Sequence, residues 1–204
     1  MALVQLGTNT KLGDGIGAVS LPPLTTCPGK TEYCSKVCYA TKGFFRMSNV
    51  QKSLAANYAT TESDDFINQV NAQIKKQKLK ALRIHPAGDL YSNEYIDKWI
   101  TIVKDNPNVR FWVYTRSWRL ASLTKKLQQL QSLPNIEVFA STDDTTAETP
   151  PNWLRVAAVS PSWDGYDQSY VKCPNQKNKT ITCEKCTYCF KPSGQKTNVV
   201  FKEH

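Results

Sequence analysis

The chain has 204 residues, of which 40% are hydrophobic and 21% are charged, and its formal net charge is +9. That length suffices for one domain with a hydrophobic core, or for one domain with an appendage. The sequence lacks a run of roughly 18 apolar residues that a membrane helix needs, and its first residues do not have the pattern of a signal peptide. We therefore expect a soluble cytoplasmic protein, in which the seven cysteines serve metal or redox chemistry and not disulfides.

The positive net charge is compatible with a negatively charged partner, either nucleic acid or an acidic protein. The lysines are spread along the chain, however, and they concentrate only at 75–83 and at 172–202. A solvated lysine face is the commoner cause of such a distribution. Contact with nucleic acid or with an acidic partner is therefore kept as an alternative.

The N-terminal residues lead into a first group of cysteines. Residues 1–24 are rich in glycine and then turn apolar, which predicts a loose lead-in and a short strand at about 16–21. The next segment, CPGKTEYCSKVCYA, spaces Cys27, Cys34 and Cys38 as C-x6-C-x3-C. Three thiolates leave a metal or an iron–sulfur cluster one ligand short, and an open position is where a substrate or cofactor binds. We predict a [4Fe-4S] cluster with an open iron on these three residues.

The residues after Cys38 are patterned as the start of a long helix, which places Cys34 and Cys38 one turn apart near its N-terminus. There the helix dipole and the free N–H groups favour the thiolate over the thiol. In the alternative interpretation, the three cysteines pack as small hydrophobic residues. Polar neighbours such as Lys30, Thr31 and Glu32 favour the metal site.

Helices and strands alternate over the middle of the chain. Helices are expected at about 44–60, after a cap formed by residues 63–65, from Ser92 to the Asn106-Pro107 pair, and from Ser122 to Pro134. Strands are predicted at 81–85, 109–115, 136–140 and 155–160. This alternation predicts a mostly parallel α/β sheet with right-handed crossovers.

Ligands of parallel sheets gather at the carboxyl ends of the strands, and polar residues follow three of the predicted strands. These residues are Gly88, Asp89, Tyr91 and Ser92, then Thr115, Arg116 and Ser117, then Ser141, Thr142, Asp143 and Asp144. Together with the first cysteine group they predict a cofactor site, in which the guanidinium of Arg116 suits a carboxylate or a phosphate. The alternatives are capping and turn roles for Ser92 and Asp143, and a structural ion pair of Arg116 with Asp143 or Asp144.

A second cysteine group lies near the end of the chain. Cys173, Cys183, Cys186 and Cys189 have the spacing C-x9-C-x2-C-x2-C in a polar segment. Four ligands of one type suit a closed and largely structural site, for zinc or for a cubane cluster. We prefer iron to zinc here because of the first group, and the two groups could also exchange ligands across the fold.

Several segments carry a resemblance to a known family: TCPGKTEYCSKVCYA, RIHPAGDLYSNEYIDKWI, RFWVYTRSW and the closing CxxCxxCF with FKEH. Over nearly the whole chain they resemble the phage and plasmid gene product 88 family. The arrangement at the strand ends is in turn similar to that of radical S-adenosylmethionine (SAM) enzymes, which are partial (β/α) barrels. The resemblance implies a partial (β/α) barrel with mostly parallel strands over 1–165 and a cysteine-rich metal-binding tail over 166–204.

Radical SAM enzymes hold a [4Fe-4S] cluster on three cysteines after the first strand, and SAM binds its free iron. By that resemblance SAM would contact Gly88, Asp89, Tyr91, Arg116, Ser141 and Asp143. The implied function is that of an iron–sulfur protein with two clusters, of which the first would reduce SAM to a radical that abstracts hydrogen from a substrate. The spacing departs from the usual C-x3-C-x2-C, since the third ligand here is Cys27, upstream of Cys34.

Two other functions are compatible with these residues. One is a metal-stabilised nucleic-acid-binding module, held by zinc or by a cluster, with aromatic contacts from Trp118, Trp153, Trp163 and Tyr166, at least half of which are expected to be buried. The other is a non-catalytic redox or iron-sensing protein of phage or plasmid origin. Of the two histidines, His85 is expected to be a satisfied strand-end residue, and His204 is a candidate to cap a site.

Overall fold

The computed structural model describes residues 3–7, 9–191 and 197–203, so His204 lies outside the described residues. It has an eight-stranded sheet in the order β1-β2-β3-β4-β5-β6-β8-β7. The strands are β1 (Gln5–Leu6), β2 (Ile16–Val19), β3 (Ala81–Ile84), β4 (Arg110–Thr115), β5 (Ile136–Asp143), β6 (Arg155–Ser160), β7 (Tyr170–Lys172) and β8 (Asn198–Lys202). All the strand pairs are parallel except that of β1 with β2. The prediction of a mixed α/β fold with a mostly parallel sheet is therefore confirmed.

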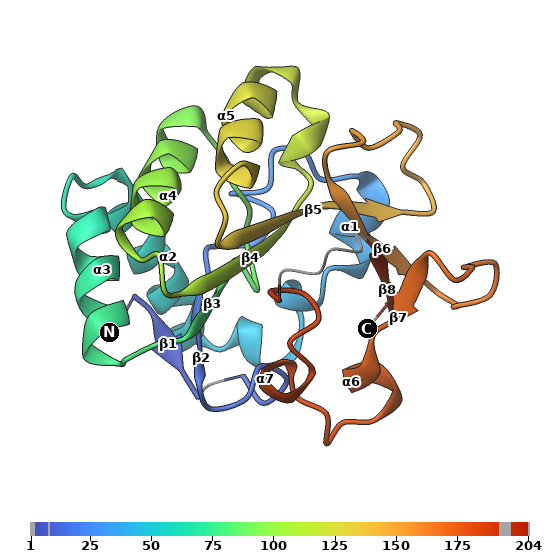
Figure 1. The fold of residues 1–204 in the computed structure, drawn as a ribbon, viewed down its shortest axis with the longest axis horizontal. Helices are drawn as coiled ribbons and strands as arrows, with labels where there is room; N and C mark the ends of the chain where they lie inside the picture. Colours follow the sequence, from blue (N-terminus) through green and yellow to red (C-terminus); the bar gives the residue numbers. More distant parts are fainter. Residues whose placement is uncertain (1–2, 8, 192–196, 204) are drawn as a thin grey trace.

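The helices differ in length and position. The longer ones are α2 (Ser48–Glu62), α3 (Phe66–Lys76), α4 (Asn93–Asp105) and α5 (Ala121–Gln131). The shorter ones are α1 (Glu32–Val37), α6 (Pro174–Lys177) and α7 (Cys183–Cys186), with 3-10 turns η1 (Tyr39–Thr41), η2 (Gly43–Arg46) and η3 (Ser117–Arg119). Figure 1 shows α3, α4 and α5 side by side along one side of the sheet, with α6 and α7 on the other side. Among the described residues, no helix combines the length and the apolar character needed to span a membrane.

The main core lies between the sheet and α3, α4 and α5. Successive residues of a strand point to opposite faces, so Phe111 and Val113 of β4 join this core while Trp112 and Tyr114 point to the other face. Trp99 of α4 is fully buried in the same core. The second face of the sheet carries two smaller apolar clusters, which also include residues of the C-terminal segment.

The predicted helix starts were partly right. The hydroxyl of Ser92 accepts a hydrogen bond from the backbone N–H of Tyr95 at 3.2 Å, as expected of an N-cap. The cap of α3 is only partly as predicted: the hydroxyl of Ser63 accepts a hydrogen bond from the backbone N–H of Asp65 at 3.1 Å. Asp65 makes no capping bond, and its carboxylate accepts from the side chains of Asn68 and Gln69. The start of α5 at Ser122 is also wrong by one residue, since this helix begins at Ala121 without a side-chain cap.

The helix predicted after Cys38 is wrong. Cys34 lies in the six-residue helix α1, which is capped by Thr31, and Cys38 is the residue that ends it. Two 3-10 turns follow before α2 begins at Ser48. Cys38 therefore lies at the C-terminal end of a helix, where the dipole opposes a negative charge.

The C-terminal segment contributes to the same sheet as the rest of the chain. Strand β8 pairs with β6, and β7 pairs with the outer edge of β8. Neither strand was predicted from the sequence. Both are short, and the segment between them holds the second cysteine group.

Candidate functional site

A cavity of about 600 Å³ lies against the face of the sheet that α3, α4 and α5 do not cover. Its floor is formed by side chains of neighbouring strands, among them Arg83 of β3, Trp112 and Tyr114 of β4, and Ala157 of β6. All seven cysteines also line it, because the first cysteine loop and the C-terminal segment form its walls. Segments that are far apart in sequence thus meet around one space.

The C-terminal wall is fastened to the turn that precedes β2. The backbone N–H of Cys183 donates to the carbonyl of Lys11 at 2.8 Å, and that of Glu184 donates to the carbonyl of Leu12 at 3.0 Å. The ring of Phe190 stacks on Trp112 with centroids 4.9 Å apart. These contacts hold the segment around α7 over the floor of the cavity.

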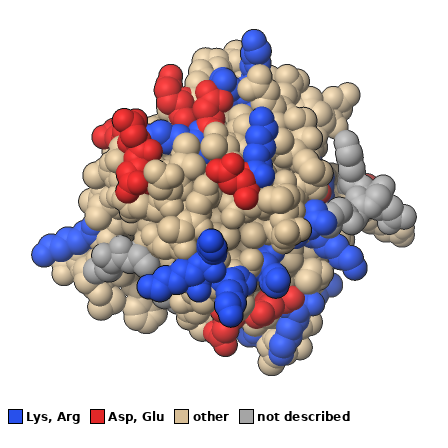
Figure 2. All heavy atoms as spheres, turned by 60° about the vertical axis from the view of Figure 1, so that its left-hand side comes forward, with Lys and Arg blue, Asp and Glu red and all other residues tan. Residues whose placement is uncertain are grey.

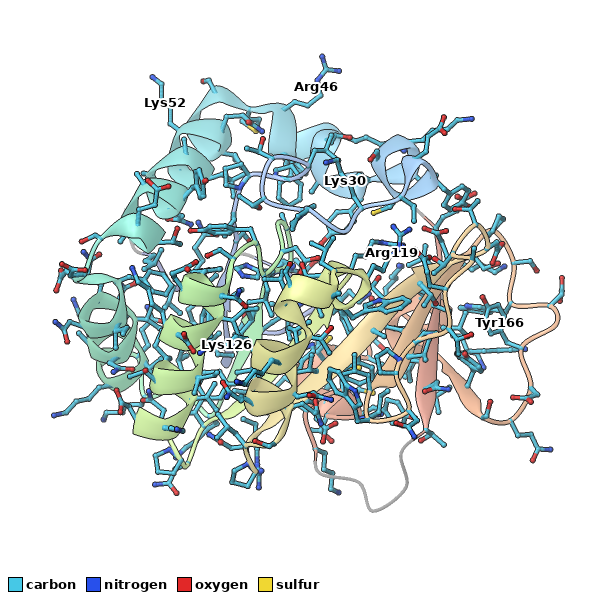
Figure 3. All side chains as sticks on the ribbon, turned by 90° about the horizontal axis from the view of Figure 1, so that it is seen from above. Lys30, Arg46, Lys52, Arg119, Lys126 and Tyr166 are labelled. Atoms are coloured by element: carbon cyan, nitrogen blue, oxygen red, sulfur yellow. The ribbon has the colours of Figure 1, made fainter. Side chains whose placement is uncertain are left out.

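The opposite wall is the loop that carries Cys27. A Cβ atom on Gly29 would lie 2.1 Å from the carbonyl oxygen of Arg116, so this loop runs directly over the end of β4. Arg119 donates from Nη1 to the carbonyl of Gly29 at 2.9 Å. Figure 3 shows Arg119 beside this loop, on which Lys30 is also labelled. Further along, the hydroxyl of Tyr39 donates to the carbonyl of Pro86, which joins η1 to the loop after β3.

Asp89 connects the loops that follow β3 and β4. Its carboxylate accepts hydrogen bonds from the backbone N–H groups of Leu90 at 2.7 Å and of Arg116 at 2.8 Å. Burial raises the pKa of Asp89 to about 6, against these hydrogen bonds. The neighbouring Gly88 has φ +86, and a Cβ there would lie 2.6 Å from that of Leu21. The backbone at Gly88 and the carboxylate of Asp89 therefore fix the shape of the cavity rim.

Arg116 and Asp143 form a buried ion pair at the same edge of the sheet. The Nη1 atom of Arg116 lies 2.8 Å from Oδ2 of Asp143, and both side chains are almost fully buried. The hydroxyl of Thr31 donates to the same oxygen at 2.7 Å. Burial raises the pKa of Asp143, but hydrogen bonds from Thr145 and Thr31 and the charge of Arg116 outweigh it, so the pKa lies below its ordinary value. The structural ion pair considered for Arg116 is thus present.

The six residues predicted to bind the cofactor separate into two sets. Gly88, Asp89, Arg116 and Ser141 line the cavity. Tyr91 points to the helical side of the sheet, where it stacks on Tyr95 at 4.7 Å and bonds to Thr61. Asp143 lies behind Arg116. Whether these residues contact a cofactor stays a prediction.

The comparisons with known proteins agree with the first of the two resemblances in the sequence and do not show the one to radical SAM enzymes. The family model described as gene product 88 matches residues 1–199. The chain belongs to the gene product 88 family. It is 27% identical over 202 residues to the gene 88 protein of Mycobacterium phage L5, covering 86% of this chain and 81% of that protein. The gene 88 protein of Mycobacterium phage D29 is 27% identical over 198 residues, covering 84% and 80%. No solved structure matches the chain.

For this member of the gene product 88 family, the prediction of an iron–sulfur protein is wrong. Among the described residues, which include all the cysteines, no group of three or more His, Cys, Asp or Glu side chains is arranged so that it could hold a metal ion. This contradicts the open [4Fe-4S] cluster and the radical SAM function built on Cys27, Cys34 and Cys38. It also contradicts the closed cluster or zinc site on Cys173, Cys183, Cys186 and Cys189.

The surroundings of the thiols give the physical reason. Spacing along the chain brings cysteines near one cavity but does not aim their sulfur atoms at one point. Cys34 lies beside the guanidinium of Arg116, and Cys189 lies beside Tyr114. Burial also raises the pKa of Cys27 and of Cys189 to about 12, so both side chains are neutral thiols in the protein without a bound metal.

The two alternative functions for this family member fail on the same ground, since both depend on a bound metal or cluster. The aromatic surface proposed for nucleic acid is also incomplete. Trp118 is buried and its indole N–H donates to the carbonyl of Ser141 at 3.0 Å, and Trp153 packs against the main core. Trp163 and Tyr166 are half-buried.

Two cationic residues of the cavity, Arg83 and Lys11, were not predicted from the sequence. Arg83 is a charged residue inside the predicted strand ALRIH, at a position that alternates with the buried Leu82 and Ile84. A charge within a buried strand was a signal that this face borders a polar space. Lys11 carried no such signal, because it precedes the strand in an irregular segment.

The expectation for His85 is wrong in one respect. The residue ends its strand and is buried, but neither ring nitrogen has a hydrogen-bond partner among the described residues. The ring lies 5.6 Å from that of Tyr95 and 6.1 Å from that of Trp99. Burial lowers the pKa of His85 to about 3, so the imidazole is neutral in the folded protein.

We predict that His85 makes the fold sensitive to acid. The pKa of His85 is 6.5 in the unfolded chain and about 3 in the folded protein. Between these pH values the unfolded chain binds a proton at His85 that the folded protein does not bind, so the free energy of unfolding decreases as the pH falls. Lowering the pH from 6.5 to about 5 should reduce the free energy of unfolding by about 2 kcal/mol through His85. His85→Phe should remove it, measured as the difference in urea unfolding between the variant and the wild type at both values. Asp89 also titrates in this pH range and changes the stability with the opposite sign, but it is present in both the variant and the wild type. If the variant and the wild type lost the same free energy of unfolding between the two pH values, His85 would not be the source of the acid sensitivity.

Proposed function

We propose that this protein binds a small molecule in the cavity on the open face of its sheet. The observation that carries the proposal is the volume of the cavity, about 600 Å³, which lies within the range of about 300–1,000 Å³ that is typical of ligand sites. The position supports it as well, since loops after β3 and β4 form the rim, where ligands of parallel sheets bind.

The chemistry of the lining supports an organic ligand. The floor and walls carry aromatic rings, among them Trp112, Tyr114, Phe190 and Phe201, and a small number of polar groups lie between them. Such a lining buries apolar surface of a ligand and uses the polar groups for orientation. We infer that the sheet wraps around the ligand as part of a (β/α) barrel would, with β1 and β7 as its edges (Figure 1).

SAM stays a prediction for the identity of this ligand. Two residues expected to hold its charged groups already have partners within the protein. Asp89 accepts from backbone N–H groups, and Arg116 pairs with Asp143. The proposal is therefore the broader one, a small organic molecule.

The proposal predicts one binding site for a small apolar probe, the fluorescent dye phenylnaphthylamine. Val159 is half-buried on β6 and lines the cavity, so Val159→Trp should fill the space. We expect the variant to bind the dye at least about tenfold more weakly than the wild type, a loss of about 1.4 kcal/mol. The measurement is a fluorescence titration at equal protein concentrations.

The matched control is Val156→Trp. Val156 lies on the same strand with the side chain on the opposite face, and it is also half-buried. The proposal requires that this variant bind the dye as the wild type does. Absence of saturable binding to the wild type, or an equal loss in both tryptophan variants, would refute a site in the cavity.

Contact with nucleic acid or with an acidic partner also stays a prediction. Figure 2 shows lysine and arginine side chains gathered over the lower part of one face and acidic side chains over its upper part. The exposed lysines Lys75, Lys76, Lys78 and Lys80 follow each other closely at the end of α3 and before β3. Figure 3 shows Arg46 and Lys52 pointing outward from η2 and α2.

A further inference from the structure

We infer that the ligand of the cavity carries a negative charge, which Arg83 and Lys11 bind together. This inference rests on the proposed function and adds the chemical class of the ligand, a small organic anion such as a carboxylate, sulfonate or phosphate. It concerns two residues that line the cavity from different segments, one on β3 and one in the turn before β2.

Arg83 is held inside the cavity wall with unused hydrogen-bonding capacity. Its Nε atom is buried and has no hydrogen-bond partner among the described residues. The guanidinium lies over the ring of Tyr114, 5.2 Å from the ring centroid. A ring face stabilises a cation but accepts no strong hydrogen bond from a second N–H group, so a donor remains for a ligand.

Two carboxylates line the cavity with these cations, those of Asp89 and Glu203, and Glu203 already accepts a hydrogen bond from the hydroxyl of Tyr33 at 2.6 Å. The ion pairs of the described residues join Arg116 to Asp143, Arg119 to Glu148, Lys126 to Asp97 and Arg155 to Glu137. Among the described residues, neither Arg83 nor Lys11 belongs to an ion pair. Asp89, which lines the same cavity, is engaged by the backbone N–H groups of Leu90 and Arg116.

Lys11 adds a second cation to the same space. Its Nζ atom lies 4.8 Å from the centroid of Phe201, a ring that lines the cavity. Arg83 lies over Tyr114 and Lys11 over Phe201, and these two rings are in contact, with centroids 5.4 Å apart. Burial lowers the pKa of Lys11, and the charge of Arg83 acts in the same direction. Both residues are half-buried, and two like charges partly removed from water without a counterion are costly, so a bound anion would relieve the repulsion.

Burial raises the pKa of Cys183, and it raises that of Cys189 to about 12, which favours the protonated form of these two thiols beside the cations. An anion from outside the chain would neutralise the two cations. The aromatic rings of Trp112 and Phe190 complete the site for an apolar part of the same molecule.

The test compares two dyes that differ by one charged group, anilinonaphthalene sulfonate (ANS) and the neutral phenylnaphthylamine. The wild type should bind ANS at least about tenfold more tightly, as expected of a hydrogen bond between charged groups. Arg83→Gln should abolish this preference and leave the affinity for the neutral dye within about twofold. Lys11→Met should reduce the preference in the same direction, and it provides a second variant outside the strands in case Arg83→Gln does not fold.

The matched control is Arg110→Gln, which removes an arginine at the other end of the sheet, where it donates to the carbonyl of Pro134. That variant should keep the preference for ANS. Equal affinities of the wild type for the two dyes, or a preference that survives both Arg83→Gln and Lys11→Met, would overturn the anion site. Saturable binding of the neutral dye would still support the cavity as a ligand site, so the two proposals fail separately.

Discussion

Replacing Arg116 by methionine should lower the free energy of unfolding by about 3–5 kcal/mol, because it leaves the carboxylate of Asp143 buried without its cation. The two side chains are 7% and 0% exposed, so water does not replace the lost partner. Thr31 and Thr145 would still donate to the carboxylate, but neither carries a charge. The measurement is equilibrium unfolding in urea at neutral pH.

A double-mutant cycle separates the ion pair from the packing of Arg116. Asp143→Asn removes the charge and keeps the size of the side chain. The double variant should be more stable than the sum of the two single losses implies, with a coupling energy of about 1–3 kcal/mol. A loss below about 1 kcal/mol for Arg116→Met would show that the pair does not stabilise this edge of the sheet.

Gly29→Ala should destabilise the protein by about 3 kcal/mol and displace the first cysteine loop from the end of β4. The new methyl group would lie 2.1 Å from the carbonyl oxygen of Arg116 and 2.5 Å from its carbonyl carbon. Both atoms belong to the backbone, which cannot turn aside as a flexible side chain does. Because this loop is a wall of the cavity, we also expect weaker binding of the neutral dye.

Gly43→Ala is the matched control for this variant. Gly43 has φ +51 and no atom within 4 Å of the position of a Cβ, so alanine there meets backbone strain but no neighbour. It should cost about 1 kcal/mol and leave dye binding unchanged. Equal losses for Gly29→Ala and Gly43→Ala, measured by thermal unfolding, would contradict the close approach of the loop to β4.

Much of the sheet could be predicted because its information is local. The apolar stretches ending at Ile84 and Thr115 have the length and burial pattern of inner parallel strands, and Ser92 provides a cap that works in place. The carboxyl ends of these strands therefore fell where the sequence predicted, and Gly88, Asp89 and Arg116 do reach the cavity.

The chemistry of the site could not be predicted in the same way. Cysteine spacing gives the separation of Cys34 and Cys38 along the chain, but the direction of each sulfur depends on contacts with distant residues such as Arg116 and Tyr114. The pairing of β8 with β6 also depends on a return of the chain that no local pattern encodes. The role of Arg83 depends on a cavity that exists only after Lys11 and the C-terminal segment have packed against the sheet.

The most direct test of a ligand site in this cavity is a crystal structure of the protein with bound ANS. We expect one dye molecule inside the cavity, with its sulfonate within hydrogen-bond distance of Arg83 and its rings against Trp112 or Phe190. A dye bound only outside the cavity, or a cavity closed by the protein's own side chains in the crystal, would contradict it.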